Sequence, residues 1–293
     1  MDKDVLRTSP VSRRTSLAAA GGLGLAAVGA FAAPAGADPG KGKGKGQGNG
    51  NGHGKGHGKG HGRRGAVTLL VTRHGRTMLN TLDRVQGYAD SPLTEPGVAI
   101  ARQLGTGLGR EDVEIDAVHC ADMVRHFQTA SSVIETHGSD LTPTRDARLR
   151  EINFGSYEGE KNGVYWTKIA NSLGYGSQEE LMSSPDFDMP TALDAGAALS
   201  DGTEVPAETS AECADRALKA LHDIAEAQAS DGGGTVLVVT SGLTIYLALD
   251  ALGADLSSVT SGFHNASVST LTYEDGEWSI GTVNDMSYVE AGA

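Results

Sequence analysis

Polar side chains follow three of the predicted β-strands, and their types suit the transfer of a phosphoryl group. Arg73 and His74 come directly after the first strand, and Arg125 lies one turn into the helix after the second. Glu151 follows the third strand. An imidazole nitrogen can attack phosphorus in line while guanidinium groups bind the phosphoryl oxygens and stabilise the transition state. A nearby carboxyl group can protonate the departing alkoxide as a general acid.

Each of these residues also has a purely structural explanation when it is taken alone. Arg73 or Arg125 could pair with a carboxylate, because residues 66–293 carry 13 Lys and Arg against 34 Asp and Glu. Glu151 could lie on the surface. Their combined position favours a binding site, because ligands of parallel α/β sheets bind beyond the carboxyl ends of the strands.

Strand and helix signals alternate along residues 66–293, where apolar runs rich in β-branched residues alternate with amphipathic stretches. The predicted strands are 66–72, 116–120, 141–145, 235–240, 268–273 and 278–283, and the predicted helices are 94–108, 122–136, 208–229 and 243–252. This order predicts a three-layer α/β/α fold around a mostly parallel sheet. Asp122 is the expected N-cap of its helix. Residues 160–205 lack a clear period and predict an inserted lid of short helices.

Residues 66–293 resemble the histidine phosphatase superfamily, in the branch that contains phosphoglycerate mutases and broad-specificity phosphatases. The matching motifs are Leu70-Val71-Thr72-Arg73-His74-Gly75-Arg76-Thr77 with Asn80, Arg84-Val85-Gln86-Gly87, Asp90-Ser91-Pro92-Leu93-Thr94, Arg125 with Gln128-Thr129-Ala130, and Leu149-Arg150-Glu151 with Gly155.

The resemblance implies a role for each of the polar residues named above. His74 would be the phosphorylated nucleophile and Glu151 the proton donor. Arg73 and Arg125 would clamp the phosphate. Further phosphate contacts are implied at Asn80 and at the pair formed by Ser241 and Gly242.

Position 241 departs from the family pattern, because family members carry a second pocket histidine in a His-Gly pair after the fourth core strand. Ser241 stands there in this chain. A hydroxyl is a shorter, neutral donor, so the chemical step is expected to slow by about 10²–10³. His126 is expected to point away from this place, because neighbouring side chains on a helix diverge by about 100°. His264 lies after the last predicted helix, also away from it. On this basis Ser241→His is expected to raise activity.

Three functions are compatible with the sequence. The first is an exported phosphomonoesterase that forms a phosphohistidine on His74 and hydrolyses a small phosphate monoester. The second is a catalytically impaired pseudophosphatase that only binds a phosphate ligand, with Ser241 as the cause. The third places the function in a wall-associated segment ahead of the domain. The residues predict no cofactor and no metal site, because arginines and one imidazole do not make a set of converging metal ligands.

The number of basic residues in the predicted lid indicates how much negative charge the substrate carries. Its only basic residues are Lys161 and Lys168. A mutase must hold a second anionic group, so the scarcity of cations favours a monophosphate ester whose remainder is neutral or apolar. Apolar lid residues could line that remainder or form the lid's own core, and these are Tyr165, Trp166, Leu181, Met182, Phe187 and Met189.

The first 65 residues differ in composition from the rest. Residues 1–37 contain Arg13 and Arg14, a short apolar run and a small-residue cleavage site, which predict a twin-arginine signal peptide. Residues 38–65 alternate Gly with Lys, His, Asn and Gln and predict a flexible tether. The protein is therefore expected to be secreted or associated with the cell wall through the basic tether, without stable membrane insertion after cleavage. The acidic surface of residues 66–293 argues against binding to nucleic acid.

The chain contains two cysteines, Cys120 and Cys213. They could pair in an oxidising compartment, but one pair is not a disulfide framework. Two reduced thiols, at least partly buried, are the preferred interpretation.

Overall fold

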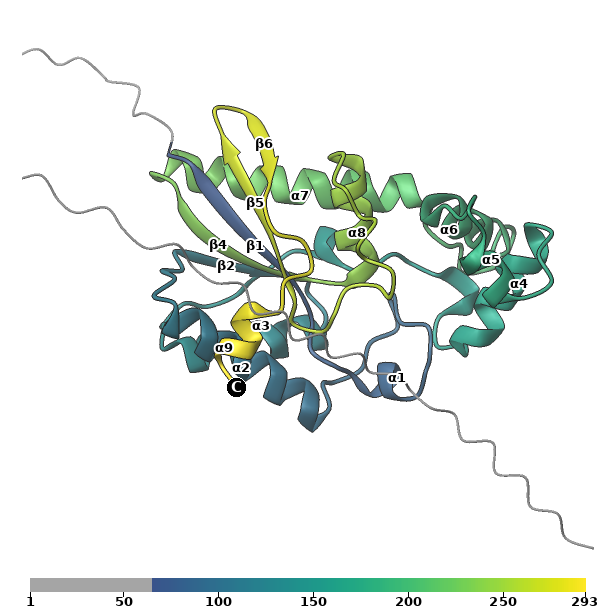
Figure 1. Cartoon of the computed structure of the whole chain (residues 1–293), viewed down its shortest axis with the longest axis horizontal. Coiled ribbons are helices and arrows are strands. Elements are labelled where there is room, and N and C mark those ends of the chain that lie inside the picture. Colours follow the sequence, from purple (N-terminus) through teal and green to yellow (C-terminus); the bar gives the residue numbers. More distant parts are fainter. Residues whose placement is uncertain (1–64) are drawn as a thin grey trace, which may run out of the picture. The chain divides into compact units, whose positions relative to one another are not determined.

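The computed structural model describes residues 65–293, which form an α/β domain built on one six-stranded sheet (Figure 1). The predicted signal peptide and all but the last residue of the predicted tether lie outside the described residues. The strand order is β3-β2-β4-β1-β5-β6. The strands are β1 (Val67–Arg73), β2 (Ala117–Cys120), β3 (Thr144–Arg145), β4 (Gly234–Thr240), β5 (Val268–Glu274) and β6 (Glu277–Ile280). β1 to β4 are parallel, and β5 and β6 form an antiparallel hairpin at one edge.

The register of the two central strands brings two chain segments together. β1 and β4 pair along their whole length, so that Arg73 lies opposite Thr240. The residues that follow, His74 and Ser241, therefore leave the sheet at the same edge. The backbone N–H of His74 donates to the carbonyl of Thr240 at 3.0 Å and continues this pairing by one residue.

Helices cover both faces of the sheet and confirm the three-layer prediction (Figure 1). α2 (Glu95–Arg110), α3 (Val124–His137) and α9 (Ser287–Ala291) pack on one face, and α7 (Ser210–Ser230) and α8 (Gly242–Ala251) pack on the other. The alternation of side chains along β1 explains why, because Leu69 and Val71 contact the α7 and α8 side while Leu70 contacts the α2 and α3 side. Within residues 65–293 no helix is long and apolar enough to cross a membrane.

Short helices occupy the segment predicted as a lid. They are α4 (Asn162–Ser172), α5 (Gln178–Ser183) and α6 (Met189–Ala198), which project beyond the sheet in Figure 1. Tyr165 and Leu181 are buried in an apolar cluster that this segment shares with neighbouring residues such as Phe154 and Cys213. Trp166, Phe187 and Met189 pack against the cluster and are partly exposed. Most of the apolar lid residues therefore form the lid's own core. Met182 is exposed.

The structure corrects two predictions about local structure. The strand predicted at 141–145 is reduced to Thr144–Arg145, because β3 is an edge strand that pairs only with His119 and Cys120 of β2. Asp122 does not cap α3. Its carboxylate binds the guanidinium of Arg150 at 2.5 and 2.6 Å, and Met123 is the N-cap residue.

Both cysteines are free and buried. Cys120 lies among the residues between the sheet and α2 and α3, whereas Cys213 lies in the cluster shared with the lid. Burial raises the pKa of both thiols to about 12, so both are protonated at neutral pH.

Two glycines allow the loop after His74 to cross the start of α2. A Cβ on Gly75 would lie 2.3 Å from the carbonyl oxygen of Gly97, and a Cβ on Gly97 would lie 2.0 Å from that of Arg76. Both contacts are with backbone atoms, which cannot rotate away. The position of His74 therefore depends on the absence of side chains at this crossing.

We expect Gly97→Ala to destabilise the protein by about 1–3 kcal/mol through overpacking. Gly163→Ala is the matched control, because Gly163 lies in α4 with no atom within 4 Å of its Cβ direction. The control is expected to gain up to about 1 kcal/mol from helix propensity. Urea unfolding curves of the two variants measure the difference, and equal stabilities would contradict the close packing at Gly97.

Candidate active site

His74 is the buried centre of the site. Its Nδ1 lies 2.8 Å from the carbonyl oxygen of Gly75. A carbonyl oxygen only accepts hydrogen bonds, so Nδ1 carries the proton of the neutral ring and Nε2 carries a lone pair. Nε2 has no hydrogen-bond partner among residues 65–293 and is the nitrogen free to attack phosphorus. Two hydrogen bonds fix the loop. The Asn265 side-chain amide donates to the His74 carbonyl at 2.8 Å, and the Thr129 hydroxyl accepts from the Gly75 N–H at 3.0 Å.

The surroundings of His74 keep its imidazole neutral. Burial lowers its pKa well below the usual value, and the positive charges of Arg125 and Arg73 lower it further. The hydrogen bond to Gly75 acts weakly in the opposite direction. A nucleophilic imidazole must be unprotonated, so burial and the two arginines favour the reactive form.

Arg125 is fully buried beside the loop formed by residues 86–91, which we call the phosphate loop. One terminal nitrogen of its guanidinium lies 3.0 Å from Oδ1 of Asp90, and the other donates to the Gly87 carbonyl at 2.7 Å. The Asp90 carboxylate thus neutralises a charge that would be costly to bury alone. Arg73 is held from the opposite side, where one of its terminal nitrogens donates to the carbonyl of Phe263.

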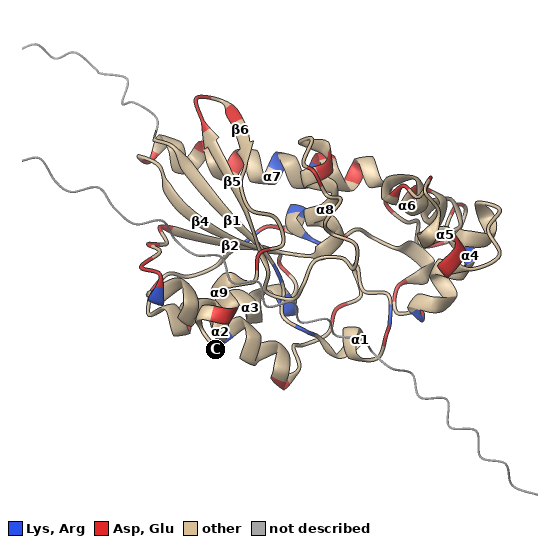
Figure 2. Cartoon of the chain, in the orientation of Figure 1, with Lys and Arg blue, Asp and Glu red and all other residues tan. Residues whose placement is uncertain are grey.

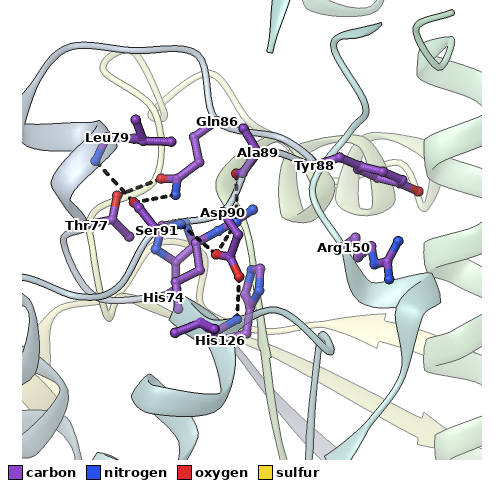
Figure 3. A network of polar contacts seen from close by, with 12 residues as sticks. His74, Thr77, Leu79, Gln86, Tyr88, Ala89, Asp90, Ser91, His126 and Arg150 are labelled. Atoms are coloured by element: carbon purple, nitrogen blue, oxygen red, sulfur yellow. Dashed lines mark hydrogen bonds and ion pairs between the residues drawn. The ribbon is translucent and has the colours of Figure 1, made fainter. Parts of the chain in front are cut away.

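A network of hydrogen bonds fixes the phosphate loop (Figure 3). Glu158 accepts from the backbone N–H groups of Gly87, Tyr88 and Ala89 at 2.6–3.0 Å. Gln86 accepts from the Thr77 hydroxyl at 2.6 Å and donates to the Ser91 hydroxyl at 3.0 Å. The predicted phosphate ligand Asn80 belongs to the same network. Its amide accepts from the Thr77 backbone N–H at 3.2 Å and donates to Gln86 at 3.4 Å, so in this structure it shapes the loop.

Glu151 is buried at the N-terminus of α8. One carboxylate oxygen accepts from the N–H and the hydroxyl of Thr244, each at 2.9 Å, and the other accepts from the Leu243 N–H at 3.1 Å. These donors hold the carboxylate in the positive field of a helix N-terminus. Burial lowers the pKa of Arg73 and of Arg125, and the negative charge of Glu151 raises both again. Glu151 is therefore close enough to interact electrostatically with both arginines. Gly242 opens the same helix, and a Cβ there would contact the Arg73 side chain at 3.5 Å.

The expectation that His126 points away from position 241 was wrong. Nε2 of His126 lies 2.7 Å from the Ser241 hydroxyl oxygen, and its ring stands edge-on to His74 with centroids 5.1 Å apart. Figure 3 shows both rings beside the phosphate loop. The side chains of Arg125 and His126 do leave α3 in different directions, but the site surrounds the first turn of this helix. Arg125 therefore reaches the phosphate loop while His126 reaches the end of β4.

Within the described residues, four buried side-chain nitrogens have no hydrogen-bond partner. Three of them are Arg73 Nε, Arg125 Nε and His126 Nδ1, and all three belong to neighbours of His74. Unpaired buried donors are rare in folded proteins because they lose their hydration without compensation. Two guanidinium groups with unpaired N–H donors beside a nucleophilic nitrogen are suited to an anion with several oxygen atoms. No group of three or more His, Cys, Asp or Glu side chains suited to a metal ion occurs in residues 65–293.

Sequence reasoning did not single out Asp90 as a partner of Arg125, and it dismissed His126. Asp90 lies within a matching motif, which was a usable signal. For His126 the indication in the sequence was its position in the first turn of the helix that also carries Arg125. Lys and Arg positions are sparse among the Asp and Glu positions along the ribbon, and several of them lie close to where the strands end (Figure 2).

We predict that His74 stays neutral well below pH 6.5 and carries its proton on Nδ1. The lowered pKa means that the unprotonated ring persists as the pH falls through 6.5 and is lost only at lower pH. A ¹⁵N NMR titration of the imidazoles measures both properties, with His74→Gln to assign the signals. Protonation near pH 6.5, or a proton on Nε2, would contradict this assignment.

Comparisons with known proteins agree with this geometry. A sequence model of the histidine phosphatase superfamily (branch 1) matches residues 69–286. The chain is 28% identical over 229 residues to a metal-independent phosphoserine phosphatase of Arabidopsis thaliana, covering 76% of this chain and 83% of the relative. It is 27% identical over 240 residues to a probable phosphoglycerate mutase GpmB of Escherichia coli, covering 76% of this chain and 95% of the relative.

Solved structures show the same relationship. The crystal structure of phosphoglycerate mutase from Bacillus anthracis str. Sterne is 40% identical with a TM-score of 0.71, and the match covers 78% of this chain and 97% of that one. The family match spans the strands, the phosphate loop and the residues around His74 described above. The chain therefore belongs to the histidine phosphatase superfamily, with the phosphoglycerate-mutase-like fold and the phosphatase character of its relatives.

Proposed function

We propose that this protein is a phosphomonoesterase that works through a phosphohistidine on His74. The observation that carries the proposal is the state of His74 itself. Its Nδ1 is held by the Gly75 carbonyl, its Nε2 is free, and its low pKa keeps that nitrogen nucleophilic. The two buried guanidinium groups beside it supply unpaired N–H donors for the phosphoryl oxygens.

The reaction follows in two displacements. Nε2 of His74 attacks phosphorus, and the bond between phosphorus and the ester oxygen breaks. Glu151 in its protonated form gives the leaving alkoxide its proton and becomes a carboxylate. Water then attacks the phosphohistidine, its proton passes to Glu151, and phosphate leaves with Nε2 regenerated. Arg73 and Arg125 stabilise the charge on the equatorial oxygens in both steps.

The proposed substrate is a small phosphate monoester with a largely uncharged remainder. Both lysines at the start of the lid are exposed, and Nζ of Lys168 lies 3.3 Å from the Tyr157 hydroxyl. The guanidinium of Arg150 is bound by Asp122 and stacks over the ring of Tyr88. Phosphoserine, the substrate named for the Arabidopsis relative, is the natural ester to compare with a neutral aryl phosphate.

We expect the full chain to hydrolyse para-nitrophenyl phosphate in the presence of EDTA, and His74→Gln to abolish turnover. Arg73→Gln should lower kcat by about 10²–10³, because it removes a donor aimed at the transition state. Arg102→Gln is the matched control, since Arg102, midway along α2, forms an exposed ion pair with Glu135 near the C-terminal end of α3. If the wild-type chain bound phosphate but released no nitrophenol, the pseudophosphatase alternative would become the better account.

Export is the second part of the proposal, and it rests on the sequence of residues 1–65. The twin arginines predict the twin-arginine route, and Ala35-Gly36-Ala37 predicts cleavage before Asp38. The basic tether would then contact anionic wall polymer.

We expect Arg13→Lys combined with Arg14→Lys to stop export, and secreted protein to begin at Asp38. Cell fractionation and N-terminal sequencing measure these two outcomes. Secreted protein that begins at Met1, or unchanged export of the double variant, would contradict this part.

A further inference from the structure

We propose that His126 is a second catalytic imidazole, which donates from Nδ1 to the phosphoryl group carried by His74, and that Ser241 positions it. This inference rests on the proposed phosphohistidine chemistry and adds a residue to it. His126 was not among the residues expected to act. The three observations behind it are its contact with the nucleophile, its single hydrogen bond and its unpaired nitrogen.

His126 has none of its surface exposed to solvent, yet only one of its two ring nitrogens is satisfied. Nε2 is 2.7 Å from the Ser241 hydroxyl oxygen, and Nδ1 has no partner among the described residues. A residue needed only to fill this space would be better apolar, because an unpaired buried nitrogen destabilises the folded state. His137 also has an unpaired buried Nδ1, so the unpaired nitrogen of His126 gains its meaning from the contact of this ring with His74.

The position of the ring points to the phosphoryl group as that ligand. The rings of His126 and His74 meet edge to face with centroids 5.1 Å apart, and Arg125 precedes His126 in the chain. Nδ1 of His126, Nε of Arg73 and Nε of Arg125 are unpaired buried nitrogens, and all three belong to residues that interact electrostatically with His74. A phosphoryl group bound to Nε2 of His74 presents three oxygens to these residues.

In this proposal Ser241 acts as the donor in its hydrogen bond with His126 and so sets which ring nitrogen carries the proton. A serine hydroxyl can donate to Nε2, and the proton of the neutral ring then lies on Nδ1. Burial, Arg125 and His74 all lower the pKa of His126, so the ring is neutral before the substrate binds. In the proposed role, the N–H of Nδ1 donates to the negative charge that develops on the phosphoryl oxygens, as the donors of an oxyanion hole do. Thr129, one turn along α3, accepts from the Gly75 N–H and so fixes the helix against the His74 loop.

The same geometry changes what is expected of Ser241→His. The Ser241 oxygen already lies within hydrogen-bond distance of His126, so an imidazole on residue 241 would overlap the His126 ring. The single substitution should not raise activity. An imidazole on residue 241 finds room only when His126 is shortened, and Ser241→His combined with His126→Ala moves the ring from one segment to the other.

The first experiment compares steady-state kinetics of the full-length variants with an aryl phosphate. His126→Gln should lower kcat about 10²-fold with little change in KM, because the lost donor acts in the transition state. Ser241→Ala should lower kcat about five- to ten-fold by loosening the ring. His126→Ala with Ser241→His should recover at least about ten-fold over His126→Ala alone, which a packing role would not explain.

His137→Gln is the matched control. His137 lies at the other end of α3, binds the Val113 carbonyl through Nε2 and also has an unpaired buried Nδ1, but it is remote from His74. Its replacement should leave kcat unchanged. If His126→Gln folds and keeps kcat within about two-fold of wild type, while His74→Gln is inactive, His126 is structural and the inference is overturned with the proposed function intact.

The second experiment does not depend on turnover or on the folding of a variant. Imidazole ¹⁵N spectra of the wild-type chain are recorded as orthovanadate, a mimic of the transferring phosphoryl group, is added. We expect signals of both His74 and His126 to move at the same vanadate concentration while those of His137 stay in place. Movement of His74 alone would overturn the role of His126. Absence of any vanadate binding would overturn the inference and the proposed function together.

Discussion

Burying two guanidinium groups beside a neutral imidazole is the constraint on which the rest of this structure depends. Positive charge taken out of water needs partners, and the two guanidinium groups here take theirs from two separate segments. Asp90 and the carbonyls of the phosphate loop hold Arg125, and the carbonyl of Phe263 holds Arg73. Glu158 in turn holds the loop through three backbone N–H groups. Much of the chain outside the sheet therefore serves to keep positive charge next to His74 in a domain that is otherwise strongly acidic.

The sequence alone predicted the three layers, the helical segment at 160–205 and the convergence of Arg73, His74, Arg125 and Glu151. These succeeded because they rest on periodicity and on the rule that parallel strands end at one edge. The short β3 and the Asp122 ion pair were missed, because edge pairing and the choice between capping and pairing depend on contacts distant in sequence. His126 was misjudged for a similar reason. A helical angle of 100° says how two side chains differ in direction, but not what surrounds the helix.

The relatives named above share this fold and differ in what they act on, which agrees with the general rule that specificity lies in side chains grafted on a common scaffold. In this chain the apolar side chains of α4, α5 and α6 mostly pack with one another. The two buried arginines beside the nucleophile are held by protein partners, Arg125 by Asp90 and Gly87 and Arg73 by the Phe263 carbonyl. In the mechanism proposed above, recognition is centred on the phosphoryl group, and His126 and Ser241 together bind one side of it.

The central claim is that Nε2 of His74 takes the phosphoryl group, and trapping that intermediate tests it most directly. Full-length protein is mixed with an aryl phosphate and quenched in alkali within milliseconds, and the phosphorylated residue is located by mass spectrometry. ³¹P NMR of the trapped protein then distinguishes the two ring nitrogens. We expect phosphohistidine at residue 74 with phosphorus on Nε2, because Nδ1 is held by the Gly75 carbonyl. Phosphorus on Nδ1, on His126 or on any other side chain would contradict it.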